Sequence, residues 1–387
     1  MIPIKYNVGN LAARRVSTLM TIVGIGVVIA VMLSMMALYN GVLSATVSSG
    51  SKDNLIVLRE GAEAELSSWI TKDAFRIIRA LPGIATFGNN EPLISPELVI
   101  LFKLPKKDDP KGSNVTVRGV TPAAFAMRPY MKVVSGRMFR PGTNELIVSR
   151  RLANRFANVS LGDSFKFGPQ TWNVVGIFDA GGTSFDSEMW TDVNYLGEAR
   201  KRTDSYSSVL LRPTDASAAS AIKASIQNDN RLKLNPKSEY QYYADQTQAL
   251  GGIRFLVGIV TFFMIIGASL GTMNTMFSAV ASRGREIATL RALGFKRRSI
   301  ILSMALESAF IALLGGIAGV LLSLPVNWIS TGTTNFQTFS EVAFNFKVDG
   351  PVAMRGLILA LLAGLIGGLL PAIRAARLPI TRALREI

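Results

Sequence analysis

The chain of 387 residues contains no cysteine and no histidine, and only 18% of its residues carry a charge. These absences exclude a zinc site of Cys or His ligands, a disulfide, a thiol nucleophile and a histidine-based catalytic triad. Soluble proteins average about 25% charged residues, so this sequence is poor in charge. Its length would accommodate two or three domains.

Signatures of enzymes are missing as well. No glycine-rich loop of the GxxxxGK[ST] type occurs in these residues, so they hold no P-loop for ATP. Neighbouring carboxylates, such as Asp108 with Asp109 or Asp186 with Glu188, could be proposed as acid–base partners. Such neighbours are expected by chance among the 21 acidic residues of positions 41–250. We interpret them as surface charge and predict a non-catalytic chain.

The sequence contains long apolar runs instead. Four segments, residues 16–39, 253–280, 300–329 and 352–371, are long enough to cross a bilayer, which takes about 20 residues. The apolar stretch of the first, about 23 residues, exceeds the roughly 7–15 residues of a signal-peptide core. We therefore expect a retained membrane anchor rather than a cleaved signal peptide.

Basic residues flank these segments unevenly. They are Lys5, Arg14 and Arg15 at the start, Arg283, Arg285, Arg291, Lys296, Arg297 and Arg298 between the second and third segments, and Arg374, Arg377, Arg382 and Arg385 in the tail. The positive-inside rule places all three groups in the cytoplasm. This predicts a multi-pass protein of the cytoplasmic (inner) membrane with both termini inside. Residues of about 41–250 and the short loop 330–350 then lie outside.

The formal net charge of +16 does not indicate nucleic-acid binding. Residues 41–250 hold 26 Lys and Arg against 21 Asp and Glu, whereas the remainder holds 16 against 5. Most of the excess cation therefore lies beside membrane segments, where it sets orientation rather than lining a groove for phosphates.

Residues 41–250 alternate short β-rich runs with helical patterns, which predicts a folded α+β domain large enough to bury a core. The expected strands are residues 54–58, 98–102, 115–120, 145–148, 164–167, 172–178 and 207–211. The expected helices are residues 66–81, 149–157 and 216–226.

Residues 282–298, between the second and third segments, are the most informative stretch. Ile287, Leu290 and Leu293 give a short helix one apolar edge. Gly294 occupies the place of a left-handed residue that ends a helix, and Phe295 is placed to fold back. The pattern predicts a short amphipathic helix facing the cytoplasm. It is either an interfacial turn anchored by arginines or a docking helix for a cytosolic partner.

The same stretch resembles a known family. The motif Arg283-x-x-Glu286-Ile-Ala-Thr-Leu-Arg-Ala-Leu-Gly294, with Arg298 and Glu307 downstream, is similar to the MacB/FtsX-type permeases of ABC transporters. Residues 10–25 and 371–385 resemble that family's start and tail. Four motifs resemble its periplasmic core domain, namely Gly136-Arg-Met-Phe139, Glu145-Leu-Ile-Val-Ser149, Leu161-Gly-Asp-x-Phe165 and Trp172-Asn-Val-Val-Gly-Ile177.

The resemblance implies an α-helical membrane protein with four transmembrane helices, one before and three after a large α+β extracytoplasmic domain. Its implied parts are residues 1–40 with the first helix, the MacB-like domain 41–250, and an FtsX-like domain 251–387 with a cytoplasmic coupling helix at 282–298. It implies a non-catalytic subunit, with ATP and Mg bound by a separate cytosolic ATPase and no cofactor on this chain. Other expected partners are a second copy of the chain, membrane lipid and a periplasmic adaptor protein.

In such permeases the coupling helix fits a cleft on the ATPase, and ATP-driven closure moves the outer domains (mechanotransmission, for export or extraction of substrate). The implied contact residues here are Arg283, Arg285, Glu286, Ile287, Leu290, Arg291, Leu293 and Gly294. Two other hypotheses stay open. One is an FtsX-like regulator that transports nothing and activates an extracytoplasmic enzyme. The other is a membrane-anchored enzyme, for which no catalytic constellation is visible.

Three spans carry GxxxG pairs, which allow the backbones of two helices to approach closely. The pairs are Gly267 with Gly271, Gly315 with Gly319, and Gly364 with Gly368. We expect at least one pair to lie at a helix–helix contact.

Glu307 is an ionisable residue inside a membrane segment, about 13 Å beyond Arg298 along a helix, and such groups are functional candidates by default. Its plainest interpretation is a group near the interface, paired with an arginine or protonated, whereas the family resemblance implies a structural or coupling role. No chain of buried acids accompanies it, so proton transport is unsupported.

The two chain ends are expected to lie on the inner membrane surface. After Pro379, a helix would place Ile380, Ala383, Leu384 and Ile387 on one face. The start of the chain, with Tyr6 and Leu11, is expected to behave in the same way.

Overall fold

The computed structural model describes residues 15–379 except 89, 336 and 337. The interfacial segments expected at both chain ends lie outside the described residues. The chain divides into two compact units. We call residues up to 40, 252–329 and 346 onward the helical unit, and residues 41–251 and 330–345 the outer unit.

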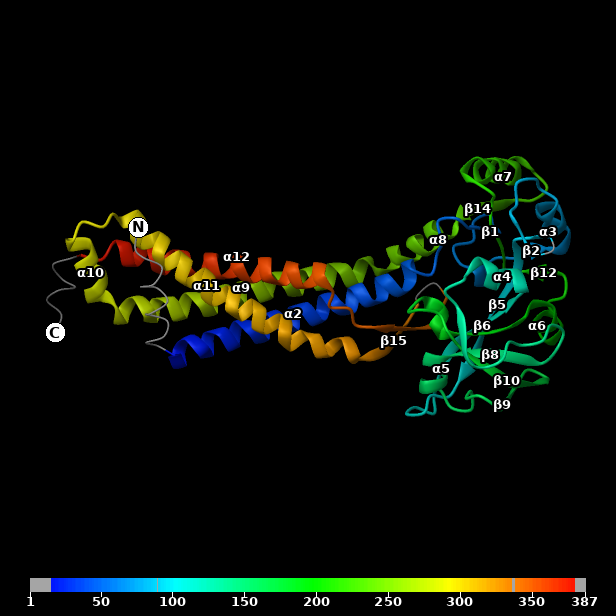
Figure 1. Cartoon of the computed structure of the whole chain (residues 1–387), viewed down its shortest axis with the longest axis horizontal. Coiled ribbons are helices and arrows are strands. Elements are labelled where there is room, and N and C mark those ends of the chain that lie inside the picture. The colour runs from blue at the N-terminus through cyan, green and yellow to red at the C-terminus, as the bar shows by residue number, and fades with distance from the viewer. Residues whose placement is uncertain (1–14, 89, 336–337, 380–387) are drawn as a thin grey trace. The chain divides into compact units, whose positions relative to one another are not determined.

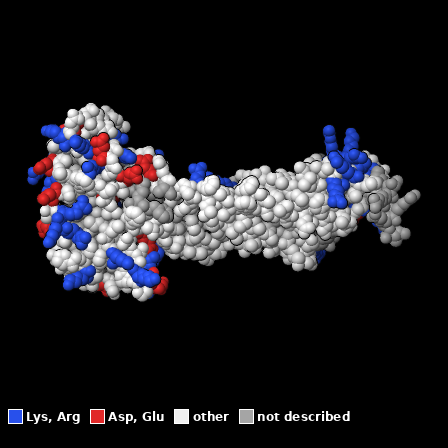
Figure 2. All heavy atoms as spheres, turned by 180° about the vertical axis from the view of Figure 1, so that it is seen from behind, with Lys and Arg blue, Asp and Glu red and all other residues white. Residues whose placement is uncertain are grey.

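The helical unit is built from long apolar helices (Figure 1). They are α2 (Arg15–Val47), α9 (Gly251–Ser282), α11 (Arg297–Ser323), which continues as the 3-10 turn η4 (Leu324–Trp328), and α12 (Gly350–Ala376), with the short α10 (Gly284–Ala292) between α9 and α11. Four described helices are long and apolar enough to cross a membrane. The drawn face of this unit carries hardly any charge between its two ends (Figure 2). The predicted arrangement of one plus three spans is confirmed.

Two apolar clusters hold the helical unit together. One joins α2, α11 and α12 through Ile25, Ile29, Met32, Leu33, Ala37, Ile311, Ala312, Val352 and Ala360. The other joins α9, α10, α11 and α12 through Met276, Val280, Ile287, Ile300, Met304, Ala372, Ala375 and Ala376. The second cluster makes α10 part of the bundle.

The outer unit is organised around a mixed ten-stranded sheet. The predicted α+β class is confirmed, whereas the sequence patterns indicated only seven strands. Its strands are β1 (Leu55–Arg59), β5 (Ile94–Leu104), β6 (Ser113–Val120), β7 (Lys132–Gly136), β8 (Glu145–Ser149), β9 (Ser164–Phe167), β10 (Gln170–Asp179), β11 (Glu188–Asp192), β13 (Ser208–Leu211) and β14 (Leu234–Ser238). The order is β14-β1-β13-β5-β6-β11-β8-β10-β7, with β9 paired to β10. The pairs β6–β11 and β8–β10 are parallel, and the others are antiparallel.

Short helices and hairpins complete the outer unit. The helices are α3 (Lys72–Arg79), α4 (Pro122–Met127), α5 (Arg150–Arg155), α6 (Val193–Ala199), α7 (Ala216–Asn228) and α8 (Glu239–Gln246), with 3-10 turns η1 (Glu65–Ser67), η2 (Ser184–Ser187) and η3 (Thr247–Leu250). Two-stranded pairs are β2 (Ile70–Thr71) with β12 (Ser205–Tyr206), β3 (Thr86–Phe87) with β4 (Glu91–Pro92), and β15 (Ser330–Thr334) with β16 (Glu341–Asn345).

Strand β1 shows how the sheet separates two cores. Ile56 and Leu58 face one cluster, which α4 and α8 cover, while Leu55 and Val57 face another, which α3 and α7 cover. This alternation follows from the two-residue period of a strand.

One sequence-based prediction about this unit was wrong in detail. The helix expected at 66–81 begins only at Lys72, because Ile70 pairs with Tyr206 in a strand and the Thr71 hydroxyl accepts from the Ala74 N–H (3.2 Å), capping α3. Residues 330–345, in the short loop expected outside the membrane, form the β15–β16 hairpin and group with the outer unit.

Candidate functional site

The helix α10 begins after Arg283 and ends before Gly294, the residue at which the sequence predicts its end. Gly294 has φ +93°. Its N–H donates to the Arg291 carbonyl (3.1 Å), and the Phe295 N–H donates to the Leu290 carbonyl (3.2 Å). This bond pair is a Schellman motif, which satisfies carbonyls that a helix end leaves without partners.

One face of α10 is buried in the helical unit. Ile287 and Ala288 are almost fully buried, and Ile287 belongs to the cluster that α9, α11 and α12 form. Arg291 is tied to the same bundle, because its Nη1 donates to the Ala376 carbonyl at the end of α12 (2.5 Å). A cation there also meets the negative end of the helix dipole.

Arg283 and Glu307 form a buried ion pair within the helical unit. The Arg283 Nη1 lies 3.1 and 3.0 Å from the two carboxylate oxygens of Glu307. The two side chains are only 10% and 6% exposed. Glu307 therefore has an arginine partner at the residue where α10 begins, and the pair fastens α10 to α11.

The other face of α10 is exposed. It presents Arg285, Glu286 and Thr289, and Leu293 is 72% exposed. The basic residues Lys296, Arg297 and Arg298 that follow are exposed as well. The structure thus divides the residues that the sequence assigned to one docking surface. Arg283 and Ile287 point into the bundle, Leu290 and Arg291 are half-buried, and Arg285, Glu286, Leu293 and Gly294 are exposed.

Two of the three glycine pairs lie where helices meet. A Cβ on Gly315 or Gly319 would come within 2.7 Å of Ile25 or Ile29 on α2, and one on Gly364 would press on Ala312 of α11. The same holds for Gly368, whose added Cβ would press on Ser308 of α11.

The third pair, Gly267 and Gly271, differs, because nothing in the described part of the chain lies within 4 Å of an added Cβ there. These two glycines line an open groove of about 640 Å³ between α9 and α2, together with residues such as Met20, Thr21 and Gly24.

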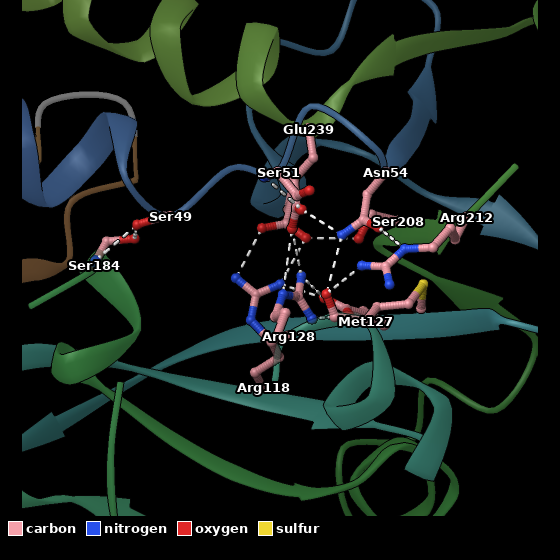
Figure 3. Close-up of polar contacts among 12 residues, drawn as sticks. Ser49, Ser51, Asn54, Arg118, Met127, Arg128, Ser184, Ser208, Arg212 and Glu239 are labelled. Atoms are coloured by element: carbon pink, nitrogen blue, oxygen red, sulfur yellow. Dashed lines mark hydrogen bonds and ion pairs between the residues drawn. The ribbon is translucent and has the colours of Figure 1, made fainter. Parts of the chain in front are cut away.

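A network of buried charges lies in the outer unit. Arg118 on β6 contacts the carboxylates of Glu65, Glu97 and Glu188 at 2.7–2.9 Å. Arg128 lies beside it and contacts Glu97 at 2.6 Å and Glu239 at 3.0 Å (Figure 3). All six side chains are buried. Because a buried charge is costly unless it is paired and hydrogen-bonded, the network depends on all its members.

The pKa values in this network follow from burial and pairing. Burial alone would raise the pKa of Glu65, but the attraction and hydrogen bonds of Arg118 outweigh it, and the pKa lies below its ordinary 4.5. Burial alone would lower the pKa of Arg118, but Glu188, Glu65 and Glu97 hold it well above its ordinary value. Glu65 and Arg118 are therefore both charged at neutral pH.

The network also fixes the points where the chain enters and leaves the outer unit. Glu239, at the start of α8, accepts from the Ser51 N–H (3.1 Å) and from the Asn54 amide (2.8 Å) (Figure 3). The Ser49 hydroxyl, just after α2, lies 2.7 Å from that of Ser184. The segments next to α2 and α9 are therefore anchored in the core of the outer unit.

Our interpretation of the neighbouring carboxylates as surface charge was wrong for Asp186 and Glu188. Both are buried. Asp186 accepts from the N–H groups of Ala180 (2.7 Å) and Gly182 (2.8 Å), and burial raises its pKa. Asp108 and Asp109 are exposed as expected. The partners of the buried acids come from distant segments, so spacing along the chain gave no signal of them.

The described residues contain no group of three or more Asp or Glu side chains placed to hold a metal ion. A cavity of about 40 Å³, which Arg118, Glu188 and Tyr243 help to line, has room for water but not for an organic substrate.

Comparison with protein families agrees with the two-part architecture. The MacB-like periplasmic core domain matches residues 18–229, and the FtsX-like permease C-terminal domain matches residues 258–380. The chain belongs to the MacB/FtsX-type permeases of ABC transporters. The resemblance seen in its sequence motifs is thereby confirmed.

Individual relatives are distant. An uncharacterized ABC transporter permease YknZ of Bacillus subtilis (strain 168) is 28% identical over 294 residues, which is 70% of each chain. A macrolide export ATP-binding/permease protein MacB of Pasteurella multocida is 24% identical over 97% of this chain and 58% of that protein. This chain thus spans little more than half the length of that MacB relative. The crystal structure of the extracellular domain of YknZ matches 48% of this chain with a TM-score of 0.37 and 18% identity.

Proposed function

We propose that this chain is the transmembrane permease subunit that couples ATP hydrolysis by a separate cytosolic ABC ATPase to movement of its extracytoplasmic domain. The movement would export or extract a substrate on the outer side of the membrane. The observation that carries the proposal is that helix α10 has one buried and one exposed face. Its inner face is fastened to three membrane helices, while its outer face exposes Arg285, Glu286 and Leu293.

A docking helix needs both properties. An exposed apolar residue ringed by charges gives a partner an anchor and a polar rim, the usual composition of an energetic centre in an interface. A rigid attachment then lets a displacement of α10 move α9, α11 and α12 together.

We propose that a second copy of the permease completes the assembly and packs against the groove that Gly267 and Gly271 line. Small residues favour close helix contacts in membranes. In the described part of this chain no helix of its own fills that face. A single cysteine at Gly271 should then cross-link two copies.

Binding to the purified ATPase tests the function. The double variant Glu286→Lys with Leu293→Asp should raise the Kd for the ATPase at least tenfold. Glu286→Lys reverses the charge of the rim, and Leu293→Asp replaces the apolar anchor by a charge that binding would bury. The matched control is Glu91→Lys with Leu161→Asp, at exposed positions of the outer unit, and should leave the Kd unchanged. Equal binding by both variants would contradict the docking role. Arg283 is unsuitable for this test, because it is buried.

A further inference from the structure

The hairpin between α11 and α12 is the only described segment after residue 251 that belongs to the outer unit. Its strands β15 and β16 pair from Ser330 with Asn345 to Thr334 with Glu341. Its base is closed within the helical unit, where Asn327 and Val348 exchange two hydrogen bonds of 2.7 and 3.2 Å. The chain of α11 and α12 therefore runs directly into a small rigid element of the outer unit.

Glu341 holds the hairpin to the rest of the outer unit. It lies on β16, is 5% exposed, and its carboxylate meets the Lys106 Nζ at 2.6 Å and the guanidinium of Arg155. Within the described residues neither oxygen has hydrogen-bond geometry, so the two cations hold it by charge. Lys106 follows β5 and Arg155 ends α5, so one carboxylate bridges two separate parts of the domain.

The surroundings of Glu341 leave it little freedom. A Cβ on Gly332 of the facing strand would lie 2.6 Å from the Arg155 Nη1 and would press on the Glu341 carboxylate. One residue pair further along, the Ala343 N–H donates to the Ser187 hydroxyl (2.6 Å). The carboxylate is thus confined by backbone on one side and by cations on the other.

Burying a carboxylate to attach the hairpin carries a desolvation penalty, and apolar contacts would stabilise the domain at least as well. A carboxylate between two cations also restrains the hairpin in both directions. Movement of the hairpin toward one cation lengthens the ion pair with the other, whereas apolar side chains slide past one another at little cost in free energy. A buried carboxylate is ion-paired on either side of the outer half of α11. Glu307, within α11, pairs with Arg283, which precedes α10, and Glu341 lies on the hairpin that follows α11.

We propose that Glu341 is a positioning residue that latches the hairpin to Lys106 and Arg155, so that a displacement of α10 passes through α11 into the outer domain. The proposal rests on the proposed function and names the route by which the force travels. Without the latch, the ATPase still docks and hydrolyses ATP, but the outer domain no longer follows.

The test uses the full chain with its ATPase in lipid nanodiscs. Because the chain has no cysteine, a single Ser220→Cys on the exposed side of α7 can carry a spin label. Pulsed EPR then measures the distance between the labels of two copies, with and without a trapped nucleotide. Wild type should show a nucleotide-dependent shift. Glu341→Gln should reduce this shift at least twofold, with an unchanged Kd for the ATPase, and its melting temperature shows whether the chain is folded at the temperature of the measurement.

Further variants separate the latch from general damage. Lys106→Gln removes one half-exposed cation and should also reduce the shift, whereas Lys106→Arg keeps the charge and should preserve it. Glu91→Gln, in an exposed ion pair with Arg79, is the matched control and should behave as wild type. If Glu341→Gln fails to fold, the two Lys106 variants decide.

The possible failures are distinguishable. A wild-type shift that persists undiminished in Glu341→Gln or Lys106→Gln overturns the latch and leaves the proposed function standing. A wild type that binds no ATPase, or shows no shift with nucleotide, overturns the proposed function and the latch with it.

Discussion

Arg283 and Glu307 lie 24 residues apart in the chain and form a buried ion pair, with one guanidinium nitrogen 3.0–3.1 Å from both carboxylate oxygens. Arg283 precedes the first residue of α10, and Glu307 lies in α11. The pair therefore joins the short helix α10 to a helix long enough to cross the membrane. The expected pairing of this intramembrane acid with an arginine is thus observed.

Removing one member of this pair should destabilise the helical unit strongly. Glu307→Gln leaves Arg283 charged and without its carboxylate, which typically costs about 3–5 kcal/mol. Replacing both, as Arg283→Met with Glu307→Leu, should restore most of the stability because no charge is left buried. Thermal unfolding of the full chain in detergent measures both. A single variant as stable as wild type would show that the pair does not hold α10.

Replacing a glycine of the bundle by alanine should change the stability of the chain according to the space beside that glycine. Gly319→Ala would place a Cβ 2.7 Å from the Ile29 Cβ and 2.8 Å from the Gly26 carbonyl oxygen. Such overpacking costs about 1–3 kcal/mol. Gly258→Ala on α9 is the control, because no described atom lies within 4 Å of its Cβ. It should be neutral or stabilising by about 0.5–1 kcal/mol. Equal melting temperatures for the two variants would contradict the packing of α11 on α2.

The outer unit should lose stability in acid through Glu65. Its pKa in the folded chain lies below the ordinary 4.5, so ionised Glu65 contributes stability above that value. The contribution disappears as the pH falls from 4.5 through the lower folded pKa. Glu65→Gln should therefore be less stable than wild type at neutral pH and lose less stability below pH 4.5.

Fluorescence of the buried Trp172 and Trp190 follows this acid unfolding in the full chain. Glu91→Gln, at an exposed position, supplies the matched control and should follow the wild-type curve. Identical acid transitions for Glu65→Gln and wild type would exclude Glu65 as the source of acid sensitivity.

Membrane orientation should be visible by cysteine labelling, since the natural chain has no cysteine. The basic residues around α10 predict a cytoplasmic position by the positive-inside rule. In intact cells, an impermeant maleimide should label Ser220→Cys and leave Thr289→Cys unlabelled until the membrane is opened. Both positions are exposed in the structure, so access decides the result. Labelling of Thr289→Cys in intact cells would place α10 on the wrong side for an ATPase.

Much of the architecture was readable from the sequence because its causes are local. A membrane span needs about 20 apolar residues in a row. The runs at 16–39, 253–280 and 352–371 lie within longer described helices, and the run at 300–329 does so except for its last residue, since the third span ends at Trp328. The end of α10 at Gly294 depends on hydrogen bonds among residues 290–295. The strand at 164–167 likewise coincides with its alternating pattern.

Only the tertiary structure decided which side chains of these elements meet. Periodicity gives α10 an apolar edge, but only the packing of α9, α11 and α12 shows that Arg283 lies inside and Leu293 outside. Glu65, Glu97 and Glu188 come from three distant segments to surround Arg118, and the hairpin with Glu341 joins the outer unit. Backbone preferences act over a few residues, whereas a buried charge finds its partner wherever the folded chain brings one close.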